Sequence, residues 1–227
     1  RWVTLLLGAA AMLLSAPRVR AGDGAEWRWW DRADGMNESY AYSVTLDPAG
    51  RLWVVHGAVP NLSILDGYRT SNLPTPGRNS KIAVAASGDA WALNPYGLFH
   101  LERSRWVRVA VPEFEAEHLS DRGRIAVDEQ GAVLLAGART LYRLQAPGRK
   151  LTAEWNAPAE LGRLGSVSVD ASGTWLVLDH GLVLRRRGSK QWDEFSSLAA
   201  GLTGLQTPWA DGSGELMMGG VERSTGR

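Results

Sequence analysis

Five repeats of one strand pattern predict an all-β fold, a β-propeller of four-stranded antiparallel blades, about five of which are visible in the sequence. In each repeat, an apolar segment is followed by a D-x-x-G turn or a close variant, and then by a second apolar segment. Apart from a brief stretch at 113–119, no part of the chain shows sustained helical periodicity. The turn glycines lie 38 to 43 residues apart, about one blade length, and are Gly50, Gly88, Gly131, Gly173 and Gly214.

The strands of each blade follow in a fixed order. The first two flank the turn glycine, in the segments 43–53, 81–91, 124–134, 166–176 and 207–217. A third strand opens on Gly-Leu or Thr-Leu at 97–101, 140–144 and 181–184. A fourth, tryptophan-containing strand follows at 106–109 and near Trp155 and Trp192. Short strands joined by Gly, Asp, Asn and Pro turns at this spacing are typical of antiparallel sheets, so each repeat predicts one blade.

The turn between the first two strands has a chemical signature. A tight hairpin needs a residue that tolerates positive φ, which glycine provides, and an aspartate three residues earlier can accept hydrogen bonds from backbone N–H groups. The second repeat has Ala85 at the aspartate position, so it must close its turn without that side chain. The aspartates expected to cap the other turns are Asp47, Asp128, Asp170 and Asp211.

Tryptophan is unusually abundant, with 11 residues against three phenylalanines. Several recur at fixed places in the repeat, where large flat side chains can fill the wedge between neighbouring blades. We therefore expect core packing, and not ligand stacking, for Trp53, Trp91, Trp106 and Trp192.

The two ends of the chain leave the number of blades open. Residues 26–30 resemble a fourth strand with no blade before it, and 215–219 and 221–224 resemble second and third strands with no fourth strand after them. The N-terminal strand could complete the last blade and close a five-blade ring, which would remove exposed sheet edges. Alternatively, the sequence is a fragment of a larger ring, truncated at its C-terminus.

The first 21 residues are predicted to be a signal peptide, which leaves 22–227 as the propeller domain. Arg1 precedes a mostly apolar run over 2–17, shorter than a bilayer-spanning helix, and a small-x-small site ends at Ala21. An uncleaved anchor helix is the alternative, and either reading places the domain in the periplasm or outside the cell. Cleavage would remove Arg1, Arg18 and Arg20 and leave a slight acidic excess.

Composition excludes several classes of function. The 25 basic residues are balanced by 24 acidic ones, so we expect no nucleic-acid partner, and without cysteine the chain has neither disulfides nor thiolate metal sites. Motifs for a nucleophile elbow, a zinc protease and a phosphate-binding loop are missing, so we expect no catalytic residues, no metal and no cofactor. The run Arg185–Arg187 is interpreted as a solvated blade edge, and 211–215 as a blade turn, not a calcium loop.

The repeats at 34–40 with 43–54, and at 200–204 with 209–220, resemble those of two-component regulator propellers. The family pattern is roughly D-G-L, then V-x-x-I-x-x-D-x-x-G-x-L-W-I-G-T; this sequence departs from it at Met36, at Val55-His56 and at Leu134. The resemblance implies an exported sensor region in front of a bacterial histidine kinase, hybrid regulator or diguanylate cyclase. The segment 81–94 is also similar to a tectonin repeat of secreted propeller lectins.

Blade geometry predicts a binding face. The loops before each first strand and those between second and third strands share one rim of a propeller, where aromatic and polar side chains would suit a small polar ligand such as a glycan fragment. Tyr42 and Arg163 lie in or beside these loops. The candidate ligand-binding residues are Tyr40, His56, Asn79, Tyr96, His118, Arg122, Asp179 and His180.

These observations favour an exported, non-catalytic ligand-sensing domain of a two-component signal-transduction protein. A secreted lectin-like glycan binder is the alternative, and a propeller enzyme without a recognisable motif is a third class. We expect no membrane contact beyond the signal or anchor segment, or a helix downstream of residue 227. The sensor could also form a homodimer.

Overall fold

The computed structural model describes residues 29–67, 69–115, 125–145 and 150–197, together with 202–203, 205, 209–210, 216–217 and 221–222. The chain divides into two units, Arg1–Trp30 and Asp31–Arg227. In the first unit, only Trp29 and Trp30 are described, so the predicted signal peptide lies outside the described residues. Where the chain is described, no helix is long and apolar enough to span a membrane.

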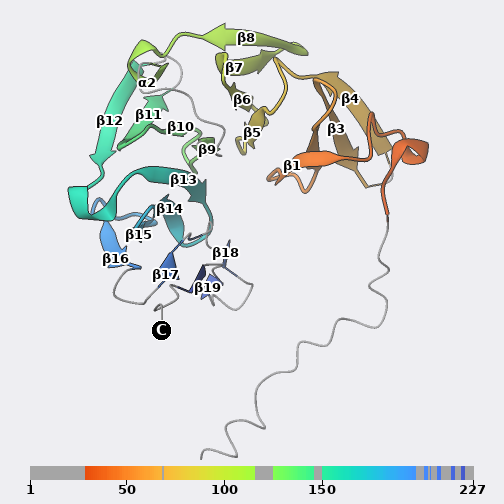
Figure 1. Cartoon of the computed structure of the whole chain (residues 1–227). Helices are drawn as coiled ribbons and strands as arrows, with labels where there is room; N and C mark the ends of the chain where they lie inside the picture. The colour runs from red at the N-terminus through yellow and green to blue at the C-terminus, as the bar shows by residue number, and fades with distance from the viewer. Residues whose placement is uncertain are drawn as a thin grey trace, which may run out of the picture. The chain divides into compact units, whose positions relative to one another are not determined.

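Four antiparallel four-stranded sheets follow one another along the chain, and each is a meander in which every strand pairs with the next (Figure 1). Blade 1 contains β1 (Ala41–Leu46), β2 (Leu52–His56), β3 (Asn61–Asp66) and β4 (Arg69–Pro74). Blade 2 contains β5 (Lys81–Val84), β6 (Ala90–Asn94), β7 (Gly97–Glu102) and β8 (Arg105–Val109). Blade 3 contains β9 (Ile125–Val127), β10 (Val133–Ala136), β11 (Thr140–Gln145) and β12 (Lys150–Asn156). Blade 4 contains β13 (Leu164–Val169), β14 (Gly173–Leu178), β15 (Gly181–Arg186) and β16 (Asp193–Ser196).

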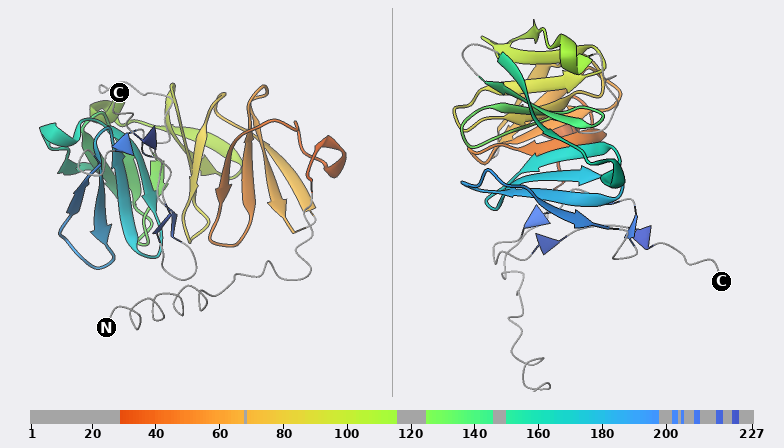
Figure 2. Two further views of the ribbon diagram at one scale, coloured as in Figure 1. Left: turned by 60° about the horizontal axis from the view of Figure 1, so that its bottom comes forward. Right: turned by 90° about the vertical axis from the view of Figure 1, so that its left-hand side faces the viewer.

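Short helical turns lie between these strands. They are η1 (Arg32–Asp34) before blade 1, α2 (Pro112–Glu115) between blades 2 and 3, and η2 (Ala159–Leu161) between blades 3 and 4. α2 coincides with the start of the segment 113–119, in which the sequence shows brief helical periodicity, and its Phe114 is buried. Figure 2 shows the blades from the side, with their strands running between two rims of loops.

The propeller prediction is confirmed, but the number of blades was wrong, because four complete blades occupy the described residues, and not about five. The fifth repeat contributes β17 (Leu202–Thr203), β18 (Trp209–Ala210), β19 (Leu216–Met217) and β20 (Val221–Glu222). These two-residue strands pair as β17 with β20 and β18 with β19, so they form no four-stranded sheet. Of the predicted N-terminal strand, Trp29 and Trp30 are described and neither is in a strand; Trp29 is 88% exposed.

Consecutive blades are held together by shared apolar clusters. Blades 1 and 2 share a cluster around Trp53, and blades 2 and 3 share one around Trp91. A third cluster joins blades 3 and 4 around Leu134 and Leu176. The prediction that the repeated tryptophans pack in the core is confirmed for Trp53 and Trp91, which are almost fully buried, while Trp106 and Trp192 are partly buried against the same clusters.

The aspartate-capped turn is also confirmed. The Asp47 carboxylate accepts backbone N–H bonds from Ala49 and Arg51, each at 2.9 Å, and a bond from the indole Nε1 of Trp53 at 2.9 Å. Asp128 and Asp170 accept backbone bonds in the same way, whereas Asp211 lies outside the described residues. The turn at Ala85 closes as expected with backbone bonds to Gly88 and Asp89.

In blade 4, the glycine that was matched to the turn glycines of the other repeats does not lie in the turn. Gly50, Gly88 and Gly131 have left-handed φ of 80°, 91° and 79° in the turns, whereas Gly173 (φ 145°) is the first residue of β14. The turn is one residue tighter there, so Trp175, and not Leu176, occupies the place of Trp53: its Nε1 lies 3.1 Å from Asp170 Oδ2. A glycine is needed at 173 for another reason, since a Cβ would lie 2.0 Å from the Arg185 carbonyl oxygen.

This difference between the glycines predicts unequal costs of substitution. Gly173→Ala should destabilise the fold by about 3 kcal/mol or more, because the new methyl group meets a rigid backbone carbonyl of the paired strand. Gly131→Ala is the matched control; a Cβ there meets nothing within 4 Å, so only the left-handed φ is penalised, at about 1 kcal/mol. Urea unfolding measures both, and equal losses would contradict the close-approach explanation.

Asp47 predicts a pH dependence of stability. Burial alone raises the pKa of Asp47, but hydrogen bonds from Trp53 and Arg51, with the charge of Arg51, outweigh it and hold the pKa below its ordinary value. The lowered pKa stabilises the folded state above the unfolded pKa of about 3.9, and this contribution is lost as pH falls through the folded value.

Asp47→Asn should therefore cost about 2 kcal/mol near pH 7, and the difference from the parent should shrink below about pH 4. The exposed Asp66→Asn is the control and should change stability by no more than about 0.5 kcal/mol. Urea unfolding at a series of pH values makes the measurement; a difference that does not change with pH would contradict the assignment.

Candidate functional site

The loops predicted to form a binding face do lie together. The Gly57 N–H donates to the Tyr40 carbonyl at 3.3 Å, the Arg163 N–H donates to Asp179 Oδ2 at 3.0 Å, and Asn94 Nδ2 donates to Ser80 Oγ at 3.2 Å. Each bond joins the loop before a first strand to the end of the second strand of the same blade, or to the loop that follows it. This rim carries exposed Tyr40, Asn79, Tyr96, Asp179 and His180.

One other predicted site residue, His56, is not accessible on this rim. His56 is fully buried at the end of β2, where its Nε2 lies 2.8 Å from Ser63 Oγ. Because Ser63 Oγ in turn donates to Asn72 Oδ1 at 2.7 Å, His56 takes part in a hydrogen-bond chain inside blade 1. His118 and Arg122 lie outside the described residues.

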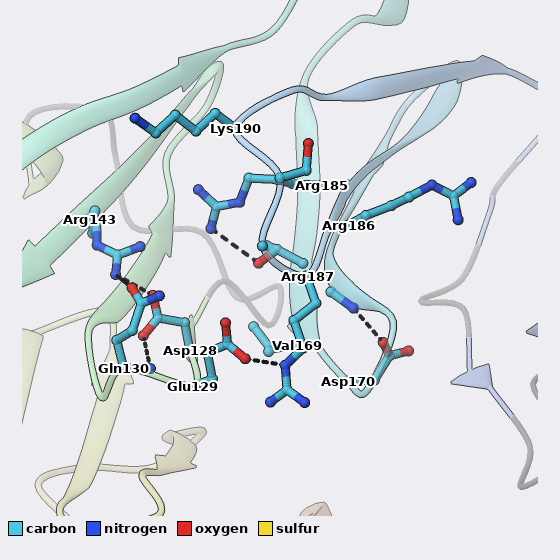
Figure 3. A pocket seen from close by; sticks show the side chains of 14 residues that line it. Asp128, Glu129, Gln130, Arg143, Val169, Asp170, Arg185, Arg186, Arg187 and Lys190 are labelled. Carbon is cyan, nitrogen blue, oxygen red and sulfur yellow. Dashed lines mark hydrogen bonds and ion pairs between the residues drawn. The ribbon is translucent and has the colours of Figure 1, made fainter.

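A better-formed cavity lies at the opposite rim, between blades 3 and 4 (Figure 3). It has a volume of about 310 Å³, and we call it the blade 3–4 groove. The turns β9–β10, β13–β14 and β15–β16 converge there, since first-to-second and third-to-fourth strand turns share one rim of an antiparallel blade. Its charged lining residues are Asp128, Glu129, Arg143, Asp170, Arg185, Arg186, Arg187 and Lys190.

Opposite charges are paired across the groove. Arg143 lies 2.6 Å from Asp128 Oδ2, and Arg143 and Arg185 both contact Glu154 Oε1, which thereby links blade 3 to blade 4. At the turns, Arg187 pairs with Glu129 and again joins the two blades. Figure 3 shows the side chains of Glu129, Arg143, Arg185 and Arg187 projecting from the two blades toward the same space.

The structure corrects the interpretation of Arg185–Arg187 as a solvated edge. The Arg186 and Arg187 side chains are exposed, but Arg185 is only 18% exposed and its guanidinium lies over the Trp192 ring, 4.9 Å from the centroid. Burial lowers the pKa of Arg185 and the nearby charge of Arg143 lowers it further, while Asp128 and Glu129 act in the opposite direction. Side chains alternate between the two faces of a strand, so along β15 Arg185 points inward and Arg186 points outward. This alternation could have been predicted from the sequence.

The groove offers hydrogen bonding from charged groups of both signs, because its lining holds five basic and three acidic side chains. Guanidinium donors and carboxylate acceptors lie side by side, with the Thr174 hydroxyl 3.4 Å from Arg185 and the aliphatic Val169 beside them. Paired donors and acceptors suit hydroxyl groups, which can both donate and accept. Within the described parts of the chain, no group of three or more metal-ligating side chains is present.

The fold is shared with extracellular domains of one- and two-component systems and with a lyase. No protein-family model matches the sequence, and no curated protein matches it. The extracellular domain of a one-component system from B. thetaiotaomicron is similar, with TM-score 0.60 and 13% identity over 82% of this chain and 26% of that chain. The extracellular domain of a hybrid two-component system from the same organism matches with TM-score 0.57 and 16% identity over 81% and 26%. An inactive virginiamycin B lyase from Staphylococcus aureus, with quinupristin, matches with TM-score 0.57 and 11% identity over 79% and 62%.

These similarities show a β-propeller of the kind found in the extracellular domains of two-component systems, as the repeats predicted. This chain spans about a quarter of the length of those domains (26%). Because a lyase has the same fold, the fold alone does not specify whether a propeller binds or catalyses.

The shared carboxylate predicts energetic coupling between blades 3 and 4. Glu154→Gln should destabilise the protein by about 2 kcal/mol, because two largely buried guanidinium groups lose their common anion. In a double-mutant cycle with Arg185→Gln, we expect a coupling energy of about 1–2 kcal/mol.

The exposed pair Arg186 and Asp193 provides the control cycle, with an expected coupling of no more than about 0.5 kcal/mol. Chemical unfolding of the four proteins in each cycle measures both values. Equal coupling in the two cycles would show that Glu154 does not join the blades.

Proposed function

We propose that this chain is the exported ligand-sensing propeller domain of a bacterial signal-transduction protein of the two-component type, without catalytic activity of its own. The observation that carries the proposal is the agreement between the repeat pattern, which resembles two-component regulator propellers, and a fold shared with extracellular domains of such systems. Export would depend on the predicted signal peptide at residues 1–21.

The ligand we propose is a small polyhydroxylated molecule such as a glycan fragment, bound in the blade 3–4 groove. A sugar ring carries hydroxyl groups that fit between the alternating guanidinium and carboxylate groups of the groove. A ligand that bridges Arg187 and Lys190 of blade 4 to the Asp128–Gln130 turn of blade 3 would stabilise one relative position of the two blades. Such a differential interaction is what a sensor needs to transmit binding.

The rim with Tyr40, Asn79, Tyr96, Asp179 and His180 stays a predicted second contact surface. Its side chains are exposed and its loops are ordered by hydrogen bonds, but the groove has the more enclosed polar groups. Homodimer formation through the sensor also stays a prediction.

Binding to the groove can be tested with a panel of defined oligosaccharides, by isothermal titration calorimetry on the whole exported chain. We expect at least one oligosaccharide to bind, and the double variant Arg187→Ala/Lys190→Ala to bind it at least about tenfold more weakly, a loss of about 1.4 kcal/mol.

The matched control is Arg105→Ala, which removes an exposed arginine on blade 2 and should leave affinity unchanged. Binding that survives the groove variant but is lost in Tyr40→Ala/Tyr96→Ala would move the site to the opposite rim. No binding to any oligosaccharide would reject the proposed ligand class.

A further inference from the structure

A second cavity runs along the axis around which the blades are arranged. The first strands of all four blades, β1, β5, β9 and β13, line it, and its volume is about 410 Å³. Figure 1 shows these four strands as the innermost ones of their blades. We call it the central channel. One end lies at the start of β5, at the rim of the predicted binding loops; the other lies at Val169, which also lines the blade 3–4 groove.

The lining of the central channel has an unbalanced charge. Among its described residues, Lys81 is the charged one, and the others are aliphatic residues, serines and a threonine. The Lys81 ammonium lies over the Tyr42 ring, 4.3 Å from its centroid, and no carboxylate in the described part of the chain lies within ion-pair distance of it. This contrasts with the groove, where Arg143, Arg185 and Arg187 each contact an acid.

The same cavity contains hydroxyl groups with unused hydrogen-bonding capacity. Ser43, on the strand next to that of Lys81, and Ser168 on β13 each have a buried Oγ with no hydrogen-bond partner among the residues the structure describes. Thr45, two residues after Ser43, instead donates to the Ile82 carbonyl at 3.0 Å. Buried hydroxyls are ordinarily paired, so the unpaired Ser43 hydroxyl, on the strand next to that of the lone cation, indicates that a partner is missing.

We propose that the central channel binds a small oxyanion, a carboxylate, phosphate or sulfate group, through the Lys81 ammonium with Ser43 as an additional donor. An oxyanion supplies the negative charge that the channel lining lacks and accepts hydrogen bonds from hydroxyl groups at the same time. This site is separate from the groove and does not depend on the ligand proposed for it.

The energetics of Lys81 are consistent with a binding role. Burial lowers the pKa of Lys81, because the charged form loses hydration without gaining an anionic partner. The charged amine therefore opposes folding at neutral pH, and stability should rise as pH increases through the folded pKa toward the unfolded value. The presence of a lysine that lowers stability is explained if a bound ligand supplies the negative charge that Lys81 lacks as a partner.

The test exploits a chain with only three lysines, Lys81, Lys150 and Lys190. Reductive ¹³C-methylation of the whole exported chain gives one NMR signal for each lysine, and Lys81→Met assigns the signal of Lys81. Sodium sulfate, phosphate and acetate are titrated separately at constant ionic strength with sodium chloride as the reference salt.

We expect at least one oxyanion to shift the Lys81 signal saturably and the Lys150 signal hardly at all. Lys81→Met should raise the dissociation constant at least tenfold and leave the unliganded protein at least as stable as the parent, whereas Lys81→Arg should retain binding. The preferred anion among the three identifies the group.

The proposal would be overturned by shifts of equal size at Lys81 and Lys150, which indicate nonspecific screening, or by saturable binding that persists in Lys81→Met. A shift confined to Lys190 would place the anion in the groove, and would likewise reject the channel. Failure of the oligosaccharide experiment would leave this result unaffected, because the probes are inorganic anions and acetate.

Discussion

The burial of each blade against its neighbours is the constraint on which the rest of this structure depends. Side chains alternate between the two faces of a strand, and both faces of the inner strands are apolar. In β5, Ile82 packs toward blade 1 and Ala83 toward blade 3; in β10, Leu134 packs toward blade 4 and Leu135 toward blade 2. No blade therefore covers its own apolar surface, and the four sheets must stack side by side around an axis. Turns, groove and channel are all positioned by this stacking.

The two cavities differ in whether their cations are paired with carboxylates, and this difference follows from where each cavity lies among the stacked blades. The groove forms where turns of blades 3 and 4 converge at one rim, so long arginine side chains from one blade reach carboxylates of the other. The channel forms where the first strands face one another, and their mostly apolar side chains bring no acid to Lys81. Hydrogen-bonded ion pairs suit a polar ligand, whereas an unpaired ammonium suits an anion.

The hydrogen bonding and packing within each repeat were predictable because the residues involved lie close together in the sequence. Asp47 and Trp53 lie in one hairpin, so the D-x-x-G turn and the buried tryptophan could be predicted together and were confirmed. The same local rule failed at Gly173, where a tighter turn shifts the alignment by one residue and brings Trp175 to Asp170. Spacing alone does not distinguish a glycine required by a positive φ in a turn from one required by the carbonyl of a neighbouring strand.

By itself, the sequence determined the all-β class, the four-stranded repeat, the capped turns and the packing role of the tryptophans, since each rests on residues a few positions apart. The tertiary structure alone decided that the predicted His56 is enclosed within blade 1, that Arg185 points into a groove while Arg186 points away, and that Lys81 faces a channel without an acid. Burial and charge pairing depend on which strands become neighbours. Glu154 and Arg185 are separated by 31 residues, and only the stacking of blades 3 and 4 brings them into contact.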